Sequence, residues 1–347
     1  MSKTGPAAIL ALIATVLAGA LVIQSLQPAQ AQRKSIRWAT ASVDTYGYKV
    51  AASVTKIIEE GLGGEYTVTV NPYPSTTLSM RAVMDGNAEI AYTADIGMSQ
   101  FHRRDGGFTK YNPRKAGLGH TWYAYPMESM IAVLASTGDR FKCWRDFSGQ
   151  PVYYTNAGFM HWLNWQRVFT VLGYNFKHLQ IDLATNTRSL QAGTIVGSAI
   201  YTTAGHALAE YWRGTEGRLD LKIINPCPDE IERMKAAGLS VVGVDAKAAF
   251  TRNSGLGPLL GVPILFGYNA RLDMPEDVIY RLIHKLYDEK DHLANANPGF
   301  VPMAQDFVGM QVSGISANPE IEVHPGLARF LKEHKAWNDK WKIGNAH

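Results

Sequence analysis

The alternation of strand-like and helix-like segments, which begins at residue 35, is the feature that most constrains the fold of this chain. Residues 35–40 alternate apolar and polar side chains, and 50–62 then carry apolar residues at helical spacing. Further strand-like segments at 66–70 and 89–93 flank a helix-like segment at 78–84. This order predicts an α/β fold with crossover helices, a mostly parallel sheet, and a ligand crevice at the carboxyl ends of the strands.

A second alternating unit follows a mostly apolar stretch at 119–135, which is too long for one average strand and is expected to pass from one sheet into another. Strand-like segments at 150–154, 197–201 and 221–224 are separated by polar turns and helix-like segments. The apolar segment 262–269 is the candidate for the return crossing. The two halves of the chain therefore share one design.

The first 31 residues have the pattern of a secretory signal peptide. Lys3 precedes an apolar run at 7–23, and the small residues before the mature chain predict cleavage after Ala31. An uncleaved anchor is the alternative, because this run has about the minimum length of roughly 17 residues that spans a membrane. We expect an exported, periplasmic protein.

Composition and cysteine count exclude several classes of protein. Charged residues make up 18% of the chain and the net charge is +4, so the basic excess of a nucleic-acid-binding protein is missing. Two cysteines are too few for a zinc site built from three or four thiolates. In an oxidising compartment, Cys143 and Cys227 either form a disulfide or remain two separate buried thiols.

Enzyme signatures are scarce in this sequence. It contains no G-x-S-x-G elbow, no H-E-x-x-H motif, no P-loop and no G-x-G-x-x-G that opens a helix. The ten histidines show no spacing typical of metal ligands. We therefore expect no catalysis, no metal site and no cofactor, with an exported enzyme as the least favoured alternative.

Hydroxyl, amide and aromatic residues gather at the strand-to-helix turns, which are expected to face one crevice. The amide groups of helix N-termini, together with such hydroxyls, can hold a carboxylate. Each Ser or Thr can instead be a helix cap that contributes about 1 kcal/mol. The residues at these turns are Ser42, Thr45, Tyr46, Ser75, Thr76, Thr77, Thr93, Asn156, Gly158, Tyr201 and Thr202.

Several short motifs, in order along nearly all of the mature chain, carry a family resemblance. They lie at 36–60, 84–91, 125–128, 146–152, 262–280 and 324–327. With these motifs the chain resembles the TAXI (TRAP-associated extracytoplasmic immunogenic) solute-binding subunits of tripartite ATP-independent periplasmic (TRAP) transporters. The segments 262–280 and 324–327 are the most specific.

The resemblance implies a two-lobed periplasmic-binding-protein fold, type II-like, with a hinge between the lobes. Lobe 1 would comprise 32–128 plus 266–347, and lobe 2 would comprise 129–265. It also implies a small organic anion as ligand, glutamate-like or a dicarboxylate, and the permease subunits of a TRAP transporter as partner. The same scaffold could alternatively serve as a sensor or docking module for a membrane receptor.

Carried over by position, the resemblance adds residues of the crossing segment and of the second-lobe turn to the cleft. These are Tyr125, Glu128, Phe159 and Met160. The turns at 40–46, 74–77 and 158–161 carry bulkier residues than is usual in the family, and Thr93 stands where a Gln often follows the third strand. An aromatic or more hydrophobic carboxylate is therefore the second expected ligand class.

Overall fold

The computed structural model describes residues 33–115, 117–253 and 255–345. The expected signal peptide, with Lys3, the apolar run 7–23 and the cleavage point at Ala31, lies outside the described residues. Ser35–His347 form a compact unit, and the description below concerns this unit. Within the described ranges, no helix combines the length and apolar character that crossing a membrane requires.

A mixed β-sheet runs through the unit, and its described part has ten strands in the order β2-β1-β3-β10-β4-β6-β5, with β7 on β6, β8 on β4 and β9 on β10. Parallel pairing joins β1 to β3 and β5 to β6, whereas β4 and β10 are antiparallel to each other and to their neighbours. The strands are β1 (Lys34–Thr40), β2 (Tyr66–Pro72), β3 (Ile90–Ala94), β4 (Trp122–Leu134), β5 (Val152–Tyr153), β6 (Gly197–Thr203), β7 (Ala207–Leu208), β8 (Leu221–Ile224), β9 (Val242–Val244) and β10 (Leu259–Ala270).

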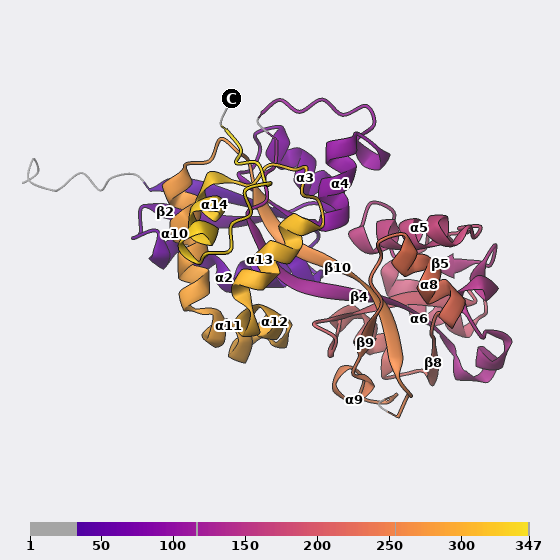
Figure 1. Cartoon of the computed structure of the whole chain (residues 1–347). Coiled ribbons are helices and arrows are strands. Elements are labelled where there is room, and N and C mark those ends of the chain that lie inside the picture. Colours follow the sequence, from indigo (N-terminus) through magenta and orange to yellow (C-terminus); the bar gives the residue numbers. More distant parts are fainter. Residues whose placement is uncertain (1–32, 116, 254, 346–347) are drawn as a thin grey trace, which may run out of the picture. The chain divides into compact units, whose positions relative to one another are not determined.

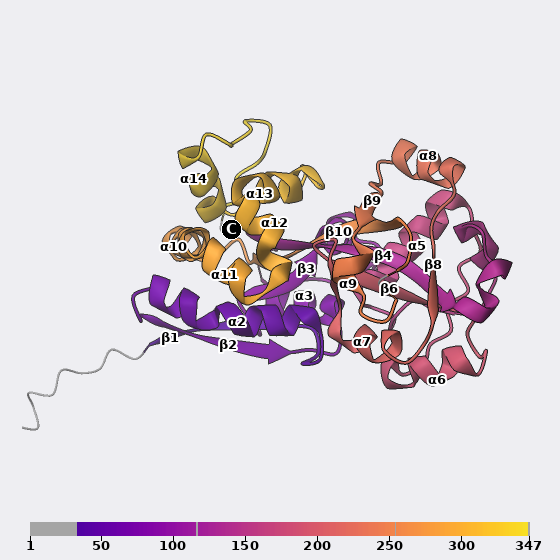
Figure 2. The ribbon, with the colours of Figure 1, turned by 90° about the horizontal axis from the view of Figure 1, so that it is seen from below.

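Helices gather around the two ends of this sheet and give a two-lobed α/β fold (Figures 1 and 2). Lobe 1 contains β1–β3 with α2–α4 and α10–α14, lobe 2 contains β5–β9 with α5–α9, and β4 and β10 run through both. The helices are α2 (Tyr46–Gly61), α3 (Thr76–Met84), α4 (Asp95–Arg103), α5 (Met160–Leu172), α6 (Asn186–Gln191), α7 (Glu210–Glu216), α8 (Pro228–Ala236), α9 (Ala246–Ala249), α10 (Glu276–Asp288), α11 (Lys290–Ala296), α12 (Val301–Gln305), α13 (Phe307–Ser316) and α14 (Pro325–Glu333).

The two long strands β4 and β10 are the feature that joins the lobes. Near one end their register pairs Trp122 with Tyr268, beside β3, and near the other it pairs Ser129 with Val262, beside β6. Most of the apolar stretch at 119–135 therefore forms the single strand β4, which serves both lobes. The expectation that this stretch passes from one sheet into another is wrong, because β4 lies in one continuous sheet. The return crossing expected at 262–269 is confirmed as part of β10.

Each lobe has its own aromatic packing. In lobe 1, the Trp38 ring meets the Tyr268 ring edge to face, with centroids 4.8 Å apart. In lobe 2, Trp144 and Trp165 meet in the same way at 4.9 Å, within a hydrophobic cluster whose buried residues all fall between 131 and 262.

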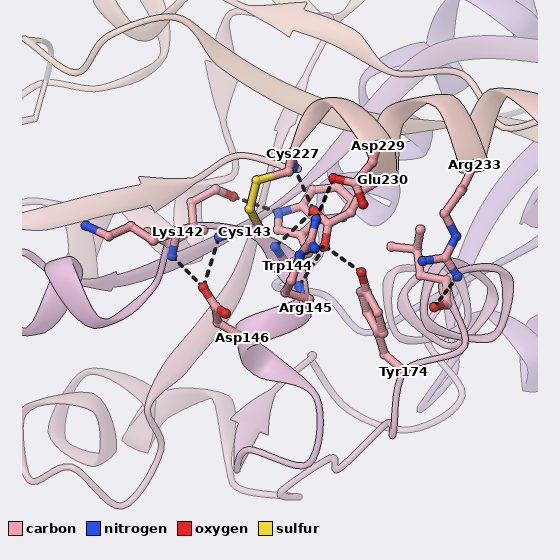
Figure 3. Close-up of polar contacts among 12 residues, drawn as sticks. Lys142, Cys143, Trp144, Arg145, Asp146, Tyr174, Cys227, Asp229, Glu230 and Arg233 are labelled. Atoms are coloured by element: carbon pink, nitrogen blue, oxygen red, sulfur yellow. Dashed lines mark hydrogen bonds and ion pairs between the residues drawn. A yellow bond between two sulfur atoms is a disulfide. The ribbon is translucent and has the colours of Figure 1, made fainter.

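A disulfide between Cys143 and Cys227 joins the start of the 3₁₀ helix η3 (Trp144–Phe147) to the start of α8 (Figure 3). Glu230 lies fully buried beside it. Its carboxylate accepts hydrogen bonds from the backbone N–H groups of Trp144, Arg145 and Cys227, at 2.7 to 3.2 Å, and from the Tyr174 hydroxyl, at 2.7 Å.

The side chains of Cys143, Cys227 and Glu230 form a group of potential metal ligands within the described residues. Both sulfurs are bonded to each other, and the carboxylate already accepts hydrogen bonds from four donors. We therefore assign the group a structural role, which is to hold two helix starts of lobe 2 together.

Candidate ligand-binding site

A narrow cavity lies where the starts of α2, α3 and α5 meet the strands. Its free volume is about 20 Å³, roughly the space of one water molecule. Lobe 1 contributes Ala41, Thr45, Thr76 and Tyr92; lobe 2 contributes Phe159, Met160, His161 and Tyr201; and the crossing strands contribute Met127 and Phe266. The cavity thus occupies the carboxyl ends of strands, where the strand-helix order predicts a crevice.

Three larger hollows lie elsewhere on the described part of the unit, and none has this position. One, of about 460 Å³, lies between α4 and α5 and includes Arg103 and Arg167. Another, of about 380 Å³, lies beside the C-terminal segment near Glu320 and Lys342. The third, of about 230 Å³, is lined by residues that include Arg140. Because none of the three contains a residue predicted for the site, we take the small cavity as the candidate site.

Five of the predicted site residues line the cavity together: Thr45, Thr76, Phe159, Met160 and Tyr201. Thr45 is also the N-cap of α2, and its hydroxyl donates to the Ser42 carbonyl, at 2.6 Å, and accepts from the Tyr48 amide, at 3.3 Å. Its hydroxyl proton is thus already used within the turn. Capping therefore accounts for the polar contacts of the Thr45 hydroxyl, whereas Ser42 contributes its backbone carbonyl and is not among the lining residues.

Ser75, Thr77 and Gly158 are chain neighbours of the lining residues Thr76 and Phe159, and they bring the two lobes into contact. The Thr77 hydroxyl of lobe 1 donates to the Gly158 carbonyl of lobe 2, at 3.2 Å. Gly158 has a φ of +90°, and a Cβ added there would lie 3.3 Å from the Ser75 Oγ. A glycine is therefore favoured at this point both by the backbone conformation and by the opposite lobe.

An aromatic layer forms one wall of the site. The Phe266 ring stacks on Tyr92, at 4.9 Å between centroids, and on Tyr125, at 5.6 Å. The Tyr92 and Tyr125 hydroxyls lie 2.7 Å apart, and burial raises the pKa of both phenols well above the usual value of 10. This wall is therefore neutral at physiological pH.

Tyr46 extends this layer away from the cavity. Its ring meets Tyr125 edge to face, at 4.9 Å, and its hydroxyl donates to the Asn297 side chain, at 2.6 Å. Burial raises the pKa of its phenol as well. Neither Tyr46 nor Tyr125 is among the cavity-lining residues, so both support the wall from behind.

Glu128 and Thr202 lie next to each other on β4 and β6, outside the cavity lining. The Glu128 carboxylate accepts from the Thr202 hydroxyl, at 2.8 Å, and from the Gly205 amide, at 2.9 Å. Its neighbour Met127 lines the cavity, and successive residues of a strand face opposite sides. Glu128 is only 2% exposed, and burial raises its pKa to about 7.

Thr93 and Asn156 also make contacts away from the cavity. The Thr93 hydroxyl contacts the Met80 sulfur, at 3.2 Å. The Asn156 side-chain oxygen accepts from the Tyr153 hydroxyl, at 3.0 Å, and from the Gln180 amide, at 2.8 Å. The structure therefore does not bring these two predicted site residues into the cavity.

His161 and Met160 open helix α5 and lie on the lobe 2 side of the cavity. His161 is 3% exposed, and burial lowers its pKa to about 3. Its Nε2 atom lies 3.1 Å from the Trp165 indole nitrogen. Met160 reaches lobe 1, because a Cβ added at Gly97 of α4 would lie 2.8 Å from its sulfur.

Sequence reasoning missed Ala41, Tyr92, Met127, His161 and Phe266. His161 is the last residue of the turn at 158–161, but only its neighbours up to Met160 were predicted to line the site. Tyr92 directly precedes the predicted Thr93, and alternation along the strand places these two side chains on opposite faces. Met127 and Phe266 belong to the crossing strands, whose pairing no local pattern shows.

The described lining residues carry no charged side chain, since His161 is neutral. The cavity offers hydroxyl groups, helix N-terminal amides and aromatic faces. Such a set can bind and orient a small molecule by hydrogen bonds and apolar contacts.

No protein-family model matches this sequence, and a search of the curated proteins finds no relative. Among solved structures, it is similar to the periplasmic aliphatic sulphonate binding protein from Escherichia coli (13% identity, TM-score 0.47, covering 87% of this chain and 79% of that one). It is also similar to the alkanesulfonate-binding protein from Xanthomonas axonopodis pv. citri bound to MOPS (12% identity, TM-score 0.45, covering 90% of this chain and 97% of that one). A third similar structure is an amino acid ABC transporter substrate-binding protein from Streptococcus pneumoniae bound to L-arginine (11% identity, TM-score 0.44, covering 80% of this chain and 95% of that one). At such low scores and identities, these similarities carry no argument about function.

Proposed function

We propose that this protein is a periplasmic solute-binding protein that captures a small organic anion and delivers it to the permease subunits of a TRAP-type transporter. The observation that carries the proposal is the meeting of three helix starts, from α2, α3 and α5, at one cavity shared by both lobes. The N-terminal ends of helices carry partial positive charge and free amide donors, which favour an anion.

Capture requires the lobes to separate and close again. The cavity has room for about one water molecule, so a ligand enters only when its walls move apart. We propose 32–128 plus 266–347 as one moving lobe and 129–265 as the other, because these limits cut β4 and β10 near their midpoints. The hydrogen bond between Thr77 and Gly158 would then close the site over the ligand.

The family resemblance favours a glutamate-like or dicarboxylate ligand. The aromatic wall favours a second candidate class, an aromatic or more hydrophobic carboxylate, because Tyr92, Phe266 and Phe159 supply large apolar faces. In either class, the ligand is released chemically unchanged to the permease.

A ligand panel tests the proposal directly. Melting temperatures are measured with a broad set of organic acids and amino acids, and denatured protein is examined by mass spectrometry for a co-purified anion. A ligand at 100 times its Kd stabilises the folded state by about 2.7 kcal/mol, so the true ligand raises the melting temperature clearly. If no anion either co-purifies or shifts the melting temperature, the proposed function is wrong.

A further inference from the structure

The protonation state of His161 follows from its contact with Trp165. An indole nitrogen can only donate a hydrogen bond, and Trp165 Nε1 lies 3.1 Å from His161 Nε2. His161 Nε2 must therefore be the acceptor and carries no proton. A neutral imidazole has one proton, so this proton is on Nδ1.

The Nδ1–H group of His161 is a buried donor on a side chain that lines the candidate site. The atom has no hydrogen-bond partner among the described residues, and His161 lines the cavity. A buried donor without a partner is destabilising, and native structures contain few of them. An acceptor atom of a bound ligand would satisfy this group.

The first turn of α5 offers further donors at the same place. This helix has 13 residues, and its N-cap, Phe159, has no side-chain group that accepts a hydrogen bond from the helix. The first amide groups of a helix have no partner within the helix itself. The His161 Nδ1–H group and the α5 amides are therefore donors on one wall of one cavity.

The other walls lack the groups that an amino acid or a dicarboxylate needs. Among the described lining residues, none offers a carboxylate to an ammonium group or a cationic side chain to a second carboxylate. Glu128, the buried carboxyl group beside Met127, accepts hydrogen bonds from Thr202 and Gly205 outside the lining. Tyr92 and Phe266 instead present stacked aromatic rings.

We propose that the His161 Nδ1–H group binds the ligand carboxylate, and that the ligand is a monocarboxylate with an apolar or aromatic body and no ammonium group. This inference rests on the proposed function and narrows its ligand class. An ammonium group would lose its water shell in this cavity without gaining a carboxylate partner, so the site selects against it.

Two matched pairs of probes test the ligand class. In each pair the molecules differ in the ammonium group: 3-phenylpropanoate with L-phenylalanine, and glutarate with L-glutamate. Isothermal titration of the mature protein should give the tightest binding for 3-phenylpropanoate, with L-phenylalanine at least about tenfold weaker. If L-phenylalanine or L-glutamate binds as tightly as 3-phenylpropanoate, or if 3-phenylpropanoate does not bind, the narrowed ligand class is overturned.

Two isosteric variants test the donor. The amide nitrogen of Asn occupies nearly the position of a histidine Nδ1, and that of Gln nearly the position of Nε2. His161→Asn, which keeps a donor near the Nδ1 position, should bind 3-phenylpropanoate at least about tenfold more tightly than His161→Gln, which does not. Equal losses in both variants would overturn the donor assignment, provided that far-ultraviolet circular dichroism shows both to be folded.

Nitrogen-15 NMR of the unchanged protein gives a readout that needs no variant. The His161 ring should be the Nδ1–H tautomer, and its proton should shift on addition of 3-phenylpropanoate. An Nε2–H tautomer would overturn the inference. The proposed function fails on a different result, namely that no organic anion of any kind binds, so the two failures are distinguishable.

Discussion

Glu128 is a residue whose burial makes stability depend on pH. Its folded-state pKa is about 7, above its ordinary value of 4.5, so between these values the folded state binds more protons than the unfolded state. The stabilisation is fully present below about pH 4.5 and is lost as the pH rises through 7. A shift of this size corresponds to about 3 kcal/mol.

Replacing Glu128 with Gln should remove this dependence, because Gln mimics the protonated acid. We expect Glu128→Gln to be more stable than the unchanged protein at pH 8 by about 2 to 3 kcal/mol, and similar to it at pH 4.5. Urea denaturation at the two pH values measures the difference. A stability difference that stays constant across this range would contradict the assigned pKa.

Thr76 and Asn156 form a contrasting pair of predicted site residues. Thr76 lines the cavity, whereas the Asn156 side chain belongs to the network with Tyr153 and Gln180. We expect Thr76→Val to weaken binding of the co-purified anion by about tenfold, since a hydroxyl donor to a charged group is lost. Asn156→Ala should lower the melting temperature but not the affinity. Titration calorimetry measures the ligand affinity of both variants. If Thr76→Val binds the ligand as tightly as the unchanged protein, Thr76 is not part of the site.

For single residues, sequence reasoning identified which turns surround the cavity but not which atoms remain available to a ligand. Thr45 stands at a predicted turn, yet its hydroxyl is used by Ser42 and Tyr48. The tautomer of the His161 ring depends on its hydrogen bond with Trp165, one helical turn later in α5. Such hydrogen-bond partners depend on side-chain geometry, which a single sequence does not encode in a local pattern.

Among the elements, the disulfide is the covalent link between η3 and α8. It joins residues 84 positions apart, so it restricts the unfolded chain strongly. In the chain-entropy model, a loop of this length contributes about 4 to 5 kcal/mol. We expect the Cys143→Ser, Cys227→Ser double variant to lose stability by roughly this amount.

Guanidinium denaturation of the double variant, beside the unchanged protein with and without dithiothreitol, measures this loss. Reduction should bring the unchanged protein close to the double variant. If the reduced and oxidised proteins unfold at the same guanidinium concentration, the disulfide contributes nothing measurable.

Element prediction succeeded where local patterns are strong and failed where tertiary contacts decide. The strands expected at 66–70, 197–201 and 221–224 coincide with β2, β6 and β8 within two residues. The strand order was not predictable, because β10 enters the sheet between β3 and β4. Helix α13 is fixed by Gln311, whose side chain binds the backbone N–H and C=O groups of Tyr123, 188 positions away.

Closure of the two lobes over the ligand is a property of the whole molecule, and a substitution at Gly158 tests it. Gly158→Ala adds a methyl group 3.3 Å from Ser75 of the opposite lobe, at a φ of +90°. Gly193→Ala is the matched control, because Gly193 has a φ of +69° and no atom within 4 Å of the added group. Both variants should lose about 1 kcal/mol of stability from the left-handed backbone.

The two variants should differ in ligand affinity. We expect Gly158→Ala to bind the anion at least about fivefold more weakly, since the added methyl hinders closure, whereas Gly193→Ala binds normally. Titration calorimetry with both variants measures this. Equal affinities would indicate that the contact between Thr77 and Gly158 has no part in capture.

The late position of β10 in the chain has a consequence for how this protein forms during synthesis. Strand β3 is buried along its whole length, and β10 is the neighbour that covers one of its edges. As the chain emerges with its N-terminus first, β4–β9 are complete before residue 259 appears. Until then β3 keeps one edge open to association with other chains, so the unfinished lobe 1 is the part of this protein most exposed to aggregation.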